Sequence, residues 1–379
     1  MAEFIRLNLE TEEGSKIRIN RDYIKPYEEE VLEILDGQDY MRKLPFARSM
    51  MISQELKANN VIEGIKDDLS IIDDVITQRK DNLSNAERKR IINLYHGYEY
   101  ILTHKNINKE SLRELYSKLS EGILDKYAVT NMGEYYREKP VYIIKGSRLD
   151  IEPFQGMKAE KVDYYMNQLF EFTNSDILEE SEIDKFIKSQ IMHFYFVYIH
   201  PYFDVNGRTS RTTSMWYLLN NKNYPYIIFN RAISFNKKGY EENIIKGRNF
   251  GDITLFIKYM LESVQKELEK EYVIHDIEQN ADMPISKEER QILEYILTMK
   301  GSITVKDLKQ FYNNYNEKRK SKYILDKIQP LLENKILINK GTTKTNITVT
   351  EPNLRLGLNP ELIEIDKRKV KHLNLDKYI

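Results

Sequence analysis

Residues 200–211 bring together side chains that suit the handling of a polyphosphate. A histidine, an acid, an Asn-Gly pair and two arginines stand at positions 200, 204, 206, 207, 208 and 211. Arg208 and Arg211 are three residues apart, so on a helix they share one face, where two guanidinium groups can grip successive phosphates. Asp204 supplies a hard oxygen ligand of the kind that Mg²⁺ takes alongside phosphate oxygens and water. The spacing therefore indicates a site for a metal-bound polyphosphate.

Two helices are expected to position these side chains. Apolar residues recur at helical intervals over residues 183–199, which predicts a core-facing helix that delivers His200 at its end, and Pro201 then stops it. A second helix is predicted over residues 208–220. The loop of residues 204–207 would then lie at the N-terminus of this second helix, where unpaired backbone N–H groups bind anions.

Residues 200–211 read HPYFDVNGRTSR, and this stretch resembles the signature HPFx(D/E)GNGRxxR of the Fic family, whose enzymes move AMP from ATP onto a protein hydroxyl. The fixed letters agree at His200, Pro201, Asp204, Asn206, Gly207, Arg208 and Arg211. Tyr202 replaces Phe, a mild aromatic change, and Val205 replaces the first Gly. A β-branched residue tolerates a positive φ angle poorly and adds bulk beside the phosphates, although the related Doc branch of the superfamily also has a non-Gly residue there.

The resemblance implies a reaction whose catalytic residues are His200, Asn206 and Arg208. A Ser, Thr or Tyr hydroxyl attacks the α-phosphorus of Mg·ATP, and His200 takes the hydroxyl proton. Asn206 and the N–H groups of the loop stabilise the charge that develops on the α-phosphate. The products are an AMP ester and pyrophosphate. The hydroxyl belongs to a target protein or to the chain itself.

The same resemblance assigns the binding of Mg²⁺ and of the nucleotide. Asp204 holds Mg²⁺ between the α- and β-phosphates, Arg208 holds the β-phosphate, and Arg211 holds the γ-phosphate. The residues expected to bind the nucleotide are Val205, Asn206, Gly207, Arg208 and Arg211. Mg²⁺ is therefore the expected cofactor and ATP the expected substrate. These motifs do not define a base pocket, so transfer of UMP or of a phosphate stays open as an alternative.

A helix is also predicted before the core, with an apolar stripe over residues 52–65 that Glu63 and Gly64 close with a turn. Alone, this pattern is an ordinary helix end. Many Fic proteins, however, carry an inhibitory helix with the pattern (S/T)xxxE(G/N), and residues 59–64 fit it except that Asn59 stands for Ser or Thr. The resemblance implies that Glu63 pairs with Arg211 and keeps it from the γ-phosphate, so that the protein inhibits itself.

Between the predicted helices, residues 133–146 alternate β-forming residues between turn residues, which predicts a small hairpin. An exposed strand edge can pair with an extended peptide. Fic proteins have a flap of the form GxYR…VxI at this place, which clamps the target segment. The matching positions are Gly133, Arg137, Val141 and Ile143, with Tyr142 between the last two. The alternative is a hairpin that only covers the core.

The fold is expected to be mainly α, with a Fic helical core, the hairpin flap and a C-terminal winged-helix (α+β) domain. A chain of 379 residues is expected to form two or three domains. The expected parts are an N-terminal helical region at 1–90, the catalytic core at 91–265, a linker at 266–282, a winged helix at 283–350 and a tail at 351–379. The winged helix is predicted from three helices, the short segment 303–305 and a hairpin wing at about 336–349.

Lys318–Lys322 head the third helix of this C-terminal domain. The charges indicate three alternatives, which are DNA binding, docking of another protein or a solvated surface. A DNA-binding regulator with a nucleotide-sensing core, in which Val205 has damaged catalysis, is therefore a second interpretation of the whole chain.

Composition excludes several other functions. With 58 basic and 59 acidic residues, no global charge favours nucleic acid or membrane. The absence of cysteine excludes disulfides and thiol catalysis, and no apolar run is long enough for a membrane span. A cytoplasmic protein is expected, and a homo-oligomer stays open. His193 is expected to be a packed, hydrogen-bonded histidine, and no metal-ligand spacing relates His96, His104, His275 and His372.

Overall fold

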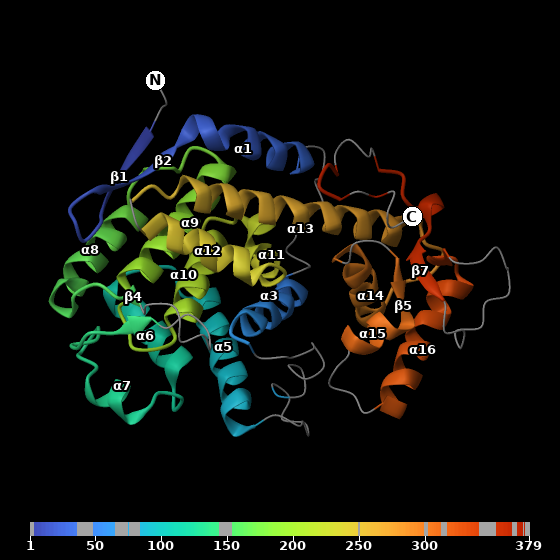
Figure 1. The fold of residues 1–379 in the computed structure, drawn as a ribbon, viewed down its shortest axis with the longest axis horizontal. Coiled ribbons are helices and arrows are strands. Elements are labelled where there is room, and N and C mark those ends of the chain that lie inside the picture. Colours follow the sequence, from blue (N-terminus) through green and yellow to red (C-terminus); the bar gives the residue numbers. More distant parts are fainter. Residues whose placement is uncertain are drawn as a thin grey trace. The chain divides into compact units, whose positions relative to one another are not determined.

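The computed structural model describes residues 4–35, 48–64, 75, 84–143, 154–248, 251–298, 302–311, 317–340, 354–365, 370–373 and 375. The chain forms two compact units, Met1–Val264 and Gln265–Ile379 (Figure 1). The two units are described separately below. Helix α13, Thr254–Asn280, begins in unit 1 and ends in unit 2.

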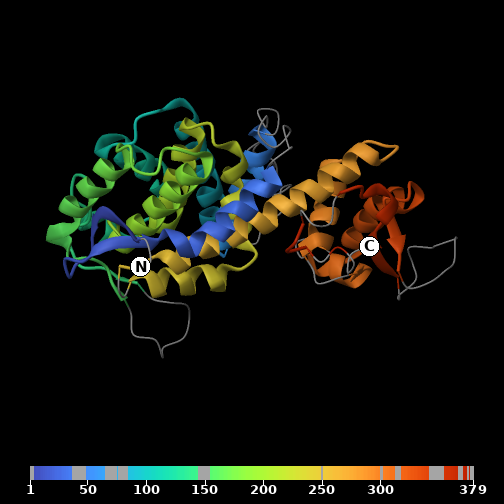
Figure 2. The same cartoon turned by 90° about the horizontal axis from the view of Figure 1, so that it is seen from above.

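Unit 1 opens with an antiparallel hairpin of β1, Phe4–Glu10, and β2, Lys16–Asn20. Helix α1, Arg21–Leu35, follows at once. The Asn20 Oδ1 accepts a hydrogen bond from the Tyr23 N–H, at 3.0 Å, and so caps the start of this helix. Figure 2 shows the hairpin and α1 from above.

The remaining described elements of unit 1 are mainly helical. They are α3 (Arg48–Ile62), α5 (Asn85–Thr103), α6 (Lys109–Ser120), α7 (Lys126–Thr130), η1 (Ala159–Lys161), α8 (Val162–Thr173), α9 (Glu182–Ile199), α10 (Asn206–Asn220), η2 (Tyr224–Ile228), α11 (Phe229–Ser234) and α12 (Lys237–Arg248). Side-chain caps set several of the starts. Ser84 forms a capping box at α5, and Ser181 accepts from the Asp184 N–H at α9.

Helices α9 and α10 lie at the centre of unit 1, with other helices around them (Figures 1 and 2). Almost every side chain of α9 is buried, which agrees with the predicted core-facing helix. Helix α10 contacts α9, α5 and α6, and Trp216 on it is fully buried. The prediction placed the start of this helix at Arg208, whereas it begins two residues earlier, at Asn206. The loop between these two central helices is therefore short and held by a buried core.

The predicted hairpin at 133–146 is wrong in its pairing. Strand β3, Tyr142–Ile143, pairs antiparallel with β4, Phe154–Gln155. Residues 133–137 form turns instead, with one isolated bridge between Met132 and Arg137. The reason is that the Arg137 N–H donates to the Pro201 carbonyl, at 3.0 Å, and so leaves the strand pairing to a later segment. Residues 144–146 of the predicted hairpin lie outside the described residues.

Besides the end of α13, the described residues of unit 2 form three further helices and a small sheet. In chain order, they are α14 (Lys287–Thr298), β5 (Ile303–Thr304), α15 (Val305–Phe311), α16 (Glu317–Glu333), β6 (Leu337–Asn339) and β7 (Arg355–Leu358), and η3 (Pro360–Leu362) follows. The sheet is antiparallel with the order β5-β7-β6. The partner of β6 is thus β7, which lies beyond the predicted wing at 336–349. Residues 341–350 of that wing lie outside the described residues.

The segments expected as linker and tail are part of the core of unit 2. Val273 and Ile277 from the expected linker, and Leu354 and Leu373 from the expected tail, belong to its buried apolar cluster. The buried Glu269 carboxylate accepts hydrogen bonds from the backbone N–H groups of residues 372 and 373. The compact unit therefore runs from 265 to 379, wider than the predicted 283–350.

No helix within the described ranges is long and apolar enough to cross a membrane.

Candidate functional site

The loop between α9 and α10 turns through two residues with left-handed backbone. His200 caps the end of α9 with φ 55°, and Val205 caps the start of α10 with φ 66°. Val205 is buried, so a β-branched side chain occupies a conformation that favours glycine. Such a residue costs about 1–3 kcal/mol and persists only where its surroundings fix it. The loop geometry is therefore held against local strain.

Asn206 helps to hold the strained loop in place. Its side-chain amide donates to the Tyr202 carbonyl, at 2.8 Å, and its Oδ1 accepts from the Tyr202 N–H, at 3.0 Å. The Tyr202 ring is fully buried and stacks on Tyr116, with 3.6 Å between ring centroids. The aromatic change at residue 202 thus keeps a packed ring beneath the loop. Asn206, expected to face the α-phosphate, is fastened to the loop itself.

His200 is held as a neutral imidazole. Burial lowers the pKa of His200 to about 3, and the charges of Arg248 and Arg137 lower this pKa further. The Arg137 Nε donates to the His200 carbonyl, at 2.8 Å, which ties the end of α9 to the segment before the flap. A neutral imidazole can accept a proton at neutral pH.

Arg137 lies inside the protein rather than on the surface of the flap. Its side chain is 2% exposed, and it donates to the carbonyls of His200, Lys139 and Met157. Burial lowers the pKa of Arg137 to about 10. Arg137 therefore joins the flap to the catalytic loop. Of the other residues expected to bind the target, Val141 is buried and Tyr142 is 60% exposed, whereas the side chain of Ile143 lies outside the described part.

Asp204 is the exposed acid of the loop. Its Oδ1 accepts a hydrogen bond from the Val205 N–H, at 2.6 Å. The second carboxylate oxygen of Asp204 is suited to Mg²⁺, which typically takes one or two protein carboxylates and fills its remaining positions with water and phosphate. The described residues contain no group of three histidine or acidic side chains that could hold a metal by themselves.

Arg208 is buried with unmet hydrogen-bonding capacity. It is 3% exposed, and its Nε and Nη1 have no hydrogen-bond partner among the described residues. Burial lowers the pKa of Arg208, while the charges of Glu63 and Asp204 act in the opposite direction. Buried guanidinium groups are normally paired, because an unpaired polar group costs about 1–3 kcal/mol, and more when it is charged. Its place on the first turn of α10 therefore indicates an anion site.

Arg211, by contrast, is bound by two residues at the end of α3. Its Nε donates to the Asn59 Oδ1, at 2.9 Å, and its Nη2 forms a short ion pair with the Glu63 Oε1. The Asn59 amide also donates to the Tyr98 hydroxyl, at 3.3 Å. The Asn side chain therefore reaches the arginine where the pattern has Ser or Thr. The pair between Glu63 and Arg211 that the resemblance implied is present.

Glu63 lies at the N-terminus of α10. A Cβ atom on Gly207 would lie 3.0 Å from the Glu63 Oε1. Burial would raise the pKa of Glu63, but the charges of Arg211 and Arg208 outweigh it, and its pKa falls below the ordinary value. The Glu63 side chain is still 31% exposed, while Gly64 turns the chain away with φ 85°. A carboxylate thus stands where the helix end would bind an anion.

Glu55 anchors α3, and sequence reasoning missed it. Its buried carboxyl accepts from the backbone N–H groups of Asn230 and Arg231, at 3.1 and 3.2 Å, which ties α3 to α11. Burial raises the pKa of Glu55 to about 8, although Arg231 opposes the shift. A signal was present, because residues 55, 59 and 63 follow at intervals of four and share one helix face.

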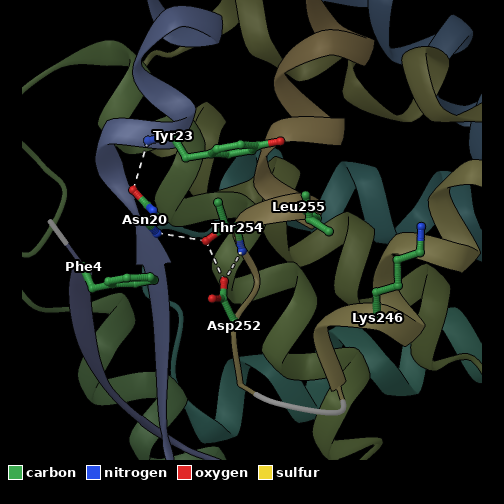
Figure 3. A pocket seen from close by; sticks show the side chains of 7 residues that line it. All are labelled: Phe4, Asn20, Tyr23, Lys246, Asp252, Thr254 and Leu255. Atoms are coloured by element: carbon green, nitrogen blue, oxygen red, sulfur yellow. Dashed lines mark hydrogen bonds between the residues drawn. The ribbon is translucent and has the colours of Figure 1, made fainter. Parts of the chain in front are cut away.

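A pocket lies apart from the loop. This pocket of about 520 Å³ is lined by Phe4, Asn20, Tyr23, Lys246, Asp252, Thr254 and Leu255 (Figure 3). Its acid, Asp252, accepts from the N–H and the hydroxyl of Thr254, at 3.1 and 2.6 Å. None of the lining residues belongs to the stretch 200–211.

Comparisons with known proteins show a family match over part of the chain and a similar fold. Residues 106–218 match the sequence model of the Fic/DOC family. The structure is similar to that of a Fic family protein from Desulfovibrio desulfuricans G20, with 20% identity, 89% of this chain and 96% of that chain covered and a TM-score of 0.56. It is also similar to Fic-1 (aa134–508) from C. elegans, with 15% identity, 65% and 71% covered and a TM-score of 0.51. No curated protein sequence matches the chain.

Residues 106–218 thus match the Fic/DOC family, and the chain has the mainly helical Fic fold with small antiparallel sheets.

Proposed function

We propose that the chain is a protein adenylyltransferase that moves AMP from Mg·ATP to a Ser, Thr or Tyr hydroxyl of a target protein or of itself. The main support is the orphaned guanidinium of Arg208 at the start of α10, on the loop that also carries the neutral His200. Together they offer an anion site and a proton acceptor. The match to the Fic/DOC family supports nucleotidyl transfer.

The target oxygen forms a bond to the α-phosphorus, and the bond from this phosphorus to the pyrophosphate oxygen breaks. His200 takes the proton of the hydroxyl and later returns it to solvent. The N–H groups at the start of α10 and the Arg208 guanidinium face the negative charge of the phosphates. Mg²⁺, held by Asp204 and phosphate oxygens, would neutralise the charge on the leaving pyrophosphate.

The contact between α3 and Arg211 supports self-inhibition within the same proposal. Glu63 forms an ion pair with the Arg211 guanidinium, which is expected to hold the γ-phosphate. ATP would then bind with its α-phosphorus out of line for attack by the target hydroxyl. Misplacement of a reacting group by about 1 Å can cost roughly a hundredfold in rate. The ion pair therefore needs little strength to inhibit, because it acts by position.

The decisive experiment incubates the purified Glu63→Gly protein with ATP tagged on its α-phosphate. Labelling of protein is expected, and the added change His200→Ala should reduce it by about 10²–10⁴-fold while Mg·ATP still binds. Equal labelling with and without His200 would defeat the proposal. Competition by untagged UTP, GTP or CTP would identify a different preferred nucleotide, and mass spectrometry of the labelled protein would show which hydroxyl is modified.

Unit 2 supports a second, separate proposal, which is that it forms a winged helix for docking DNA or protein. Its three helices and the sheet order β5-β7-β6 suit that fold. The expected contact residues, Lys318–Lys322, lie at the start of α16, and among them only Lys322 has a described side chain, which is exposed. Binding to duplex DNA that weakens with salt, and weakens again when these lysines are replaced by Gln, would support DNA docking. Binding that is independent of these lysines would contradict it.

A further inference from the structure

Arg211 has one more partner, which lies outside both α3 and the loop. The hydroxyl of Tyr240, on α12, is close enough to its guanidinium to interact with it, and after Glu63 this interaction contributes to the raised pKa of Arg211. Tyr240 is 5% exposed.

Tyr240 is itself held by a buried histidine. The His193 Nε2 lies 2.6 Å from the Tyr240 hydroxyl, and His193 is fully buried on α9. Burial lowers the pKa of His193 to about 3, so the ring is neutral, and in the tautomer with its proton on Nδ1 the Nε2 accepts a hydrogen bond from the Tyr240 hydroxyl. The oxygen lone pairs of Tyr240 are then left to accept from Arg211.

Aromatic rings surround this contact. The His193 ring has Phe229 and Phe256 as neighbours, with centroid distances of 6.5 and 6.1 Å. The phenol of Tyr240 also packs near Phe256, at 6.5 Å. With the His193 proton on Nδ1, the Tyr240 hydroxyl donates to His193 and can accept from Arg211.

We propose that Tyr240, backed by His193, is the positioning residue that aims Arg211 at the γ-phosphate when Glu63 is absent. The inference rests on the proposed function. The two kinds of partner differ in charge: Glu63 neutralises the guanidinium and competes with a phosphate, whereas a neutral phenol fixes its direction and leaves its charge available. Arg211 would thus exchange its partner, from Glu63 to the γ-phosphate of ATP, while its guanidinium stays in the same position.

The test compares binding of Mg·ATP with binding of Mg·ADP by calorimetry, because only ATP carries the γ-phosphate. The proteins are the full chain with Glu63→Gly and the same chain with Tyr240→Phe added, which removes the hydroxyl and keeps the ring. We expect the second change to weaken ATP binding about tenfold, the size of a lost charge-assisted hydrogen bond, and to leave ADP binding within twofold. A merely structural tyrosine would affect both nucleotides equally.

Two further variants sharpen the result, both in the Glu63→Gly chain. His193→Phe keeps a ring among the aromatic neighbours but removes the acceptor, so it should lower the preference for ATP in the same direction by a smaller factor. Tyr259→Phe is the matched control. Its hydroxyl donates to the Asn236 carbonyl, at 2.8 Å, so this preference should not change.

The outcomes distinguish the positioning role of Tyr240 from the proposed adenylyltransferase function. Protein labelling by Glu63→Gly, together with an unchanged preference for ATP over ADP after Tyr240→Phe, would overturn the positioning role alone. Absence of nucleotide binding by Glu63→Gly would overturn both the positioning role and the proposed function.

Discussion

Two arginines, Arg290 in unit 2 and Arg208 in unit 1, are similarly buried but differ completely in their partners. Arg290 forms ion pairs with Glu271 and Glu278, both at 2.5 Å, and with Glu294, at 3.3 Å. Arg208 leaves two of its nitrogens without a hydrogen bond. Arg290 has three carboxylate partners within its own unit, although its Nε forms no hydrogen bond, whereas neither Nε nor Nη1 of Arg208 has a hydrogen-bond partner among the described residues.

This difference distinguishes an arginine that stabilises the fold from an arginine that is available to bind a ligand. The carboxylates around Arg290 outweigh the effect of burial and raise its pKa, whereas burial dominates at Arg208 and lowers its pKa. A buried charge that stays unsatisfied is unfavourable for the folded protein, so a ligand that satisfies it binds with correspondingly more free energy. The position of Arg208 on the first turn of a buried helix adds the partial positive charge of the helix end.

Replacing Arg290 tests the structural side and has the largest expected effect. Arg290→Met should lower the free energy of unfolding by about 3 kcal/mol, because it leaves three partly buried carboxylates without their cation. Chemical denaturation of the full chain would measure it. Lys327→Met is the control, because its pair with Glu288 is half exposed and contributes less than about 1 kcal/mol. Equal losses in the two variants would contradict the assignment.

Replacing Arg208 tests the binding side. In the Glu63→Gly chain, Arg208→Met should weaken Mg·ATP binding by about a hundredfold, since a phosphate loses a charge-assisted contact of up to about 3 kcal/mol. The free energy of unfolding should stay the same or rise, because the variant removes an unpaired buried charge. Calorimetry and denaturation would measure the two quantities. A loss of stability with unchanged nucleotide affinity would place Arg208 among the structural arginines.

Releasing Arg211 gives a smaller change, and in the opposite direction. Glu63→Gly should raise AMP transfer by roughly tenfold or more without altering the fold, because Arg211 becomes free to hold the γ-phosphate. Rates of labelling by α-tagged ATP, with circular dichroism for the fold, would measure it. Arg211→Ala should lose activity in either background. If Glu63→Gly labels at the wild-type rate, α3 is only part of the scaffold.

The smallest expected effect concerns pH. A histidine with a pKa of 6.5 would be about 90% protonated at pH 5.5 and would lose about tenfold in activity as a base. With its pKa lowered to about 3, His200 stays neutral over this range. The kcat/KM of Glu63→Gly should therefore lose less than about twofold between pH 7 and pH 5.5. A tenfold decrease centred near pH 6.5 would show that His200 is not buried in the free enzyme.

Sequence reasoning found the loop because its residues are neighbours in the chain. The helix at 182–199 and its delivery of His200 follow from local periodicity. Arg137 is different, since its three carbonyl partners include residues 200 and 157, and no local pattern reveals such contacts. The same holds for the partner of β3, which lies after residue 153, and for the early start of α10, which the strained Val205 permits.

Long-range contacts also decide the outcome at Asn59. The sequence showed only that the residue differs from Ser or Thr. Whether its longer side chain still reaches Arg211 depends on where α3 lies, and Glu55 and its backbone partners on α11 contribute to that position. The roles of Tyr240 and His193 were hidden for the same reason, because the three residues in that contact come from three helices.

The placement of α3 has a thermodynamic consequence on the proposed function. If Glu63 and the γ-phosphate compete for Arg211, docking of α3 and binding of ATP weaken each other by the same factor. A partner that draws residues 48–64 away would strengthen ATP binding, and saturating ATP would loosen α3 to the same degree. Hydrogen exchange of the backbone amides of α3 would then report the occupancy of the nucleotide site. The coupling through α3 would thus act in both directions. A partner that binds α3 would change the affinity for ATP, and bound ATP would change the affinity of α3 for that partner.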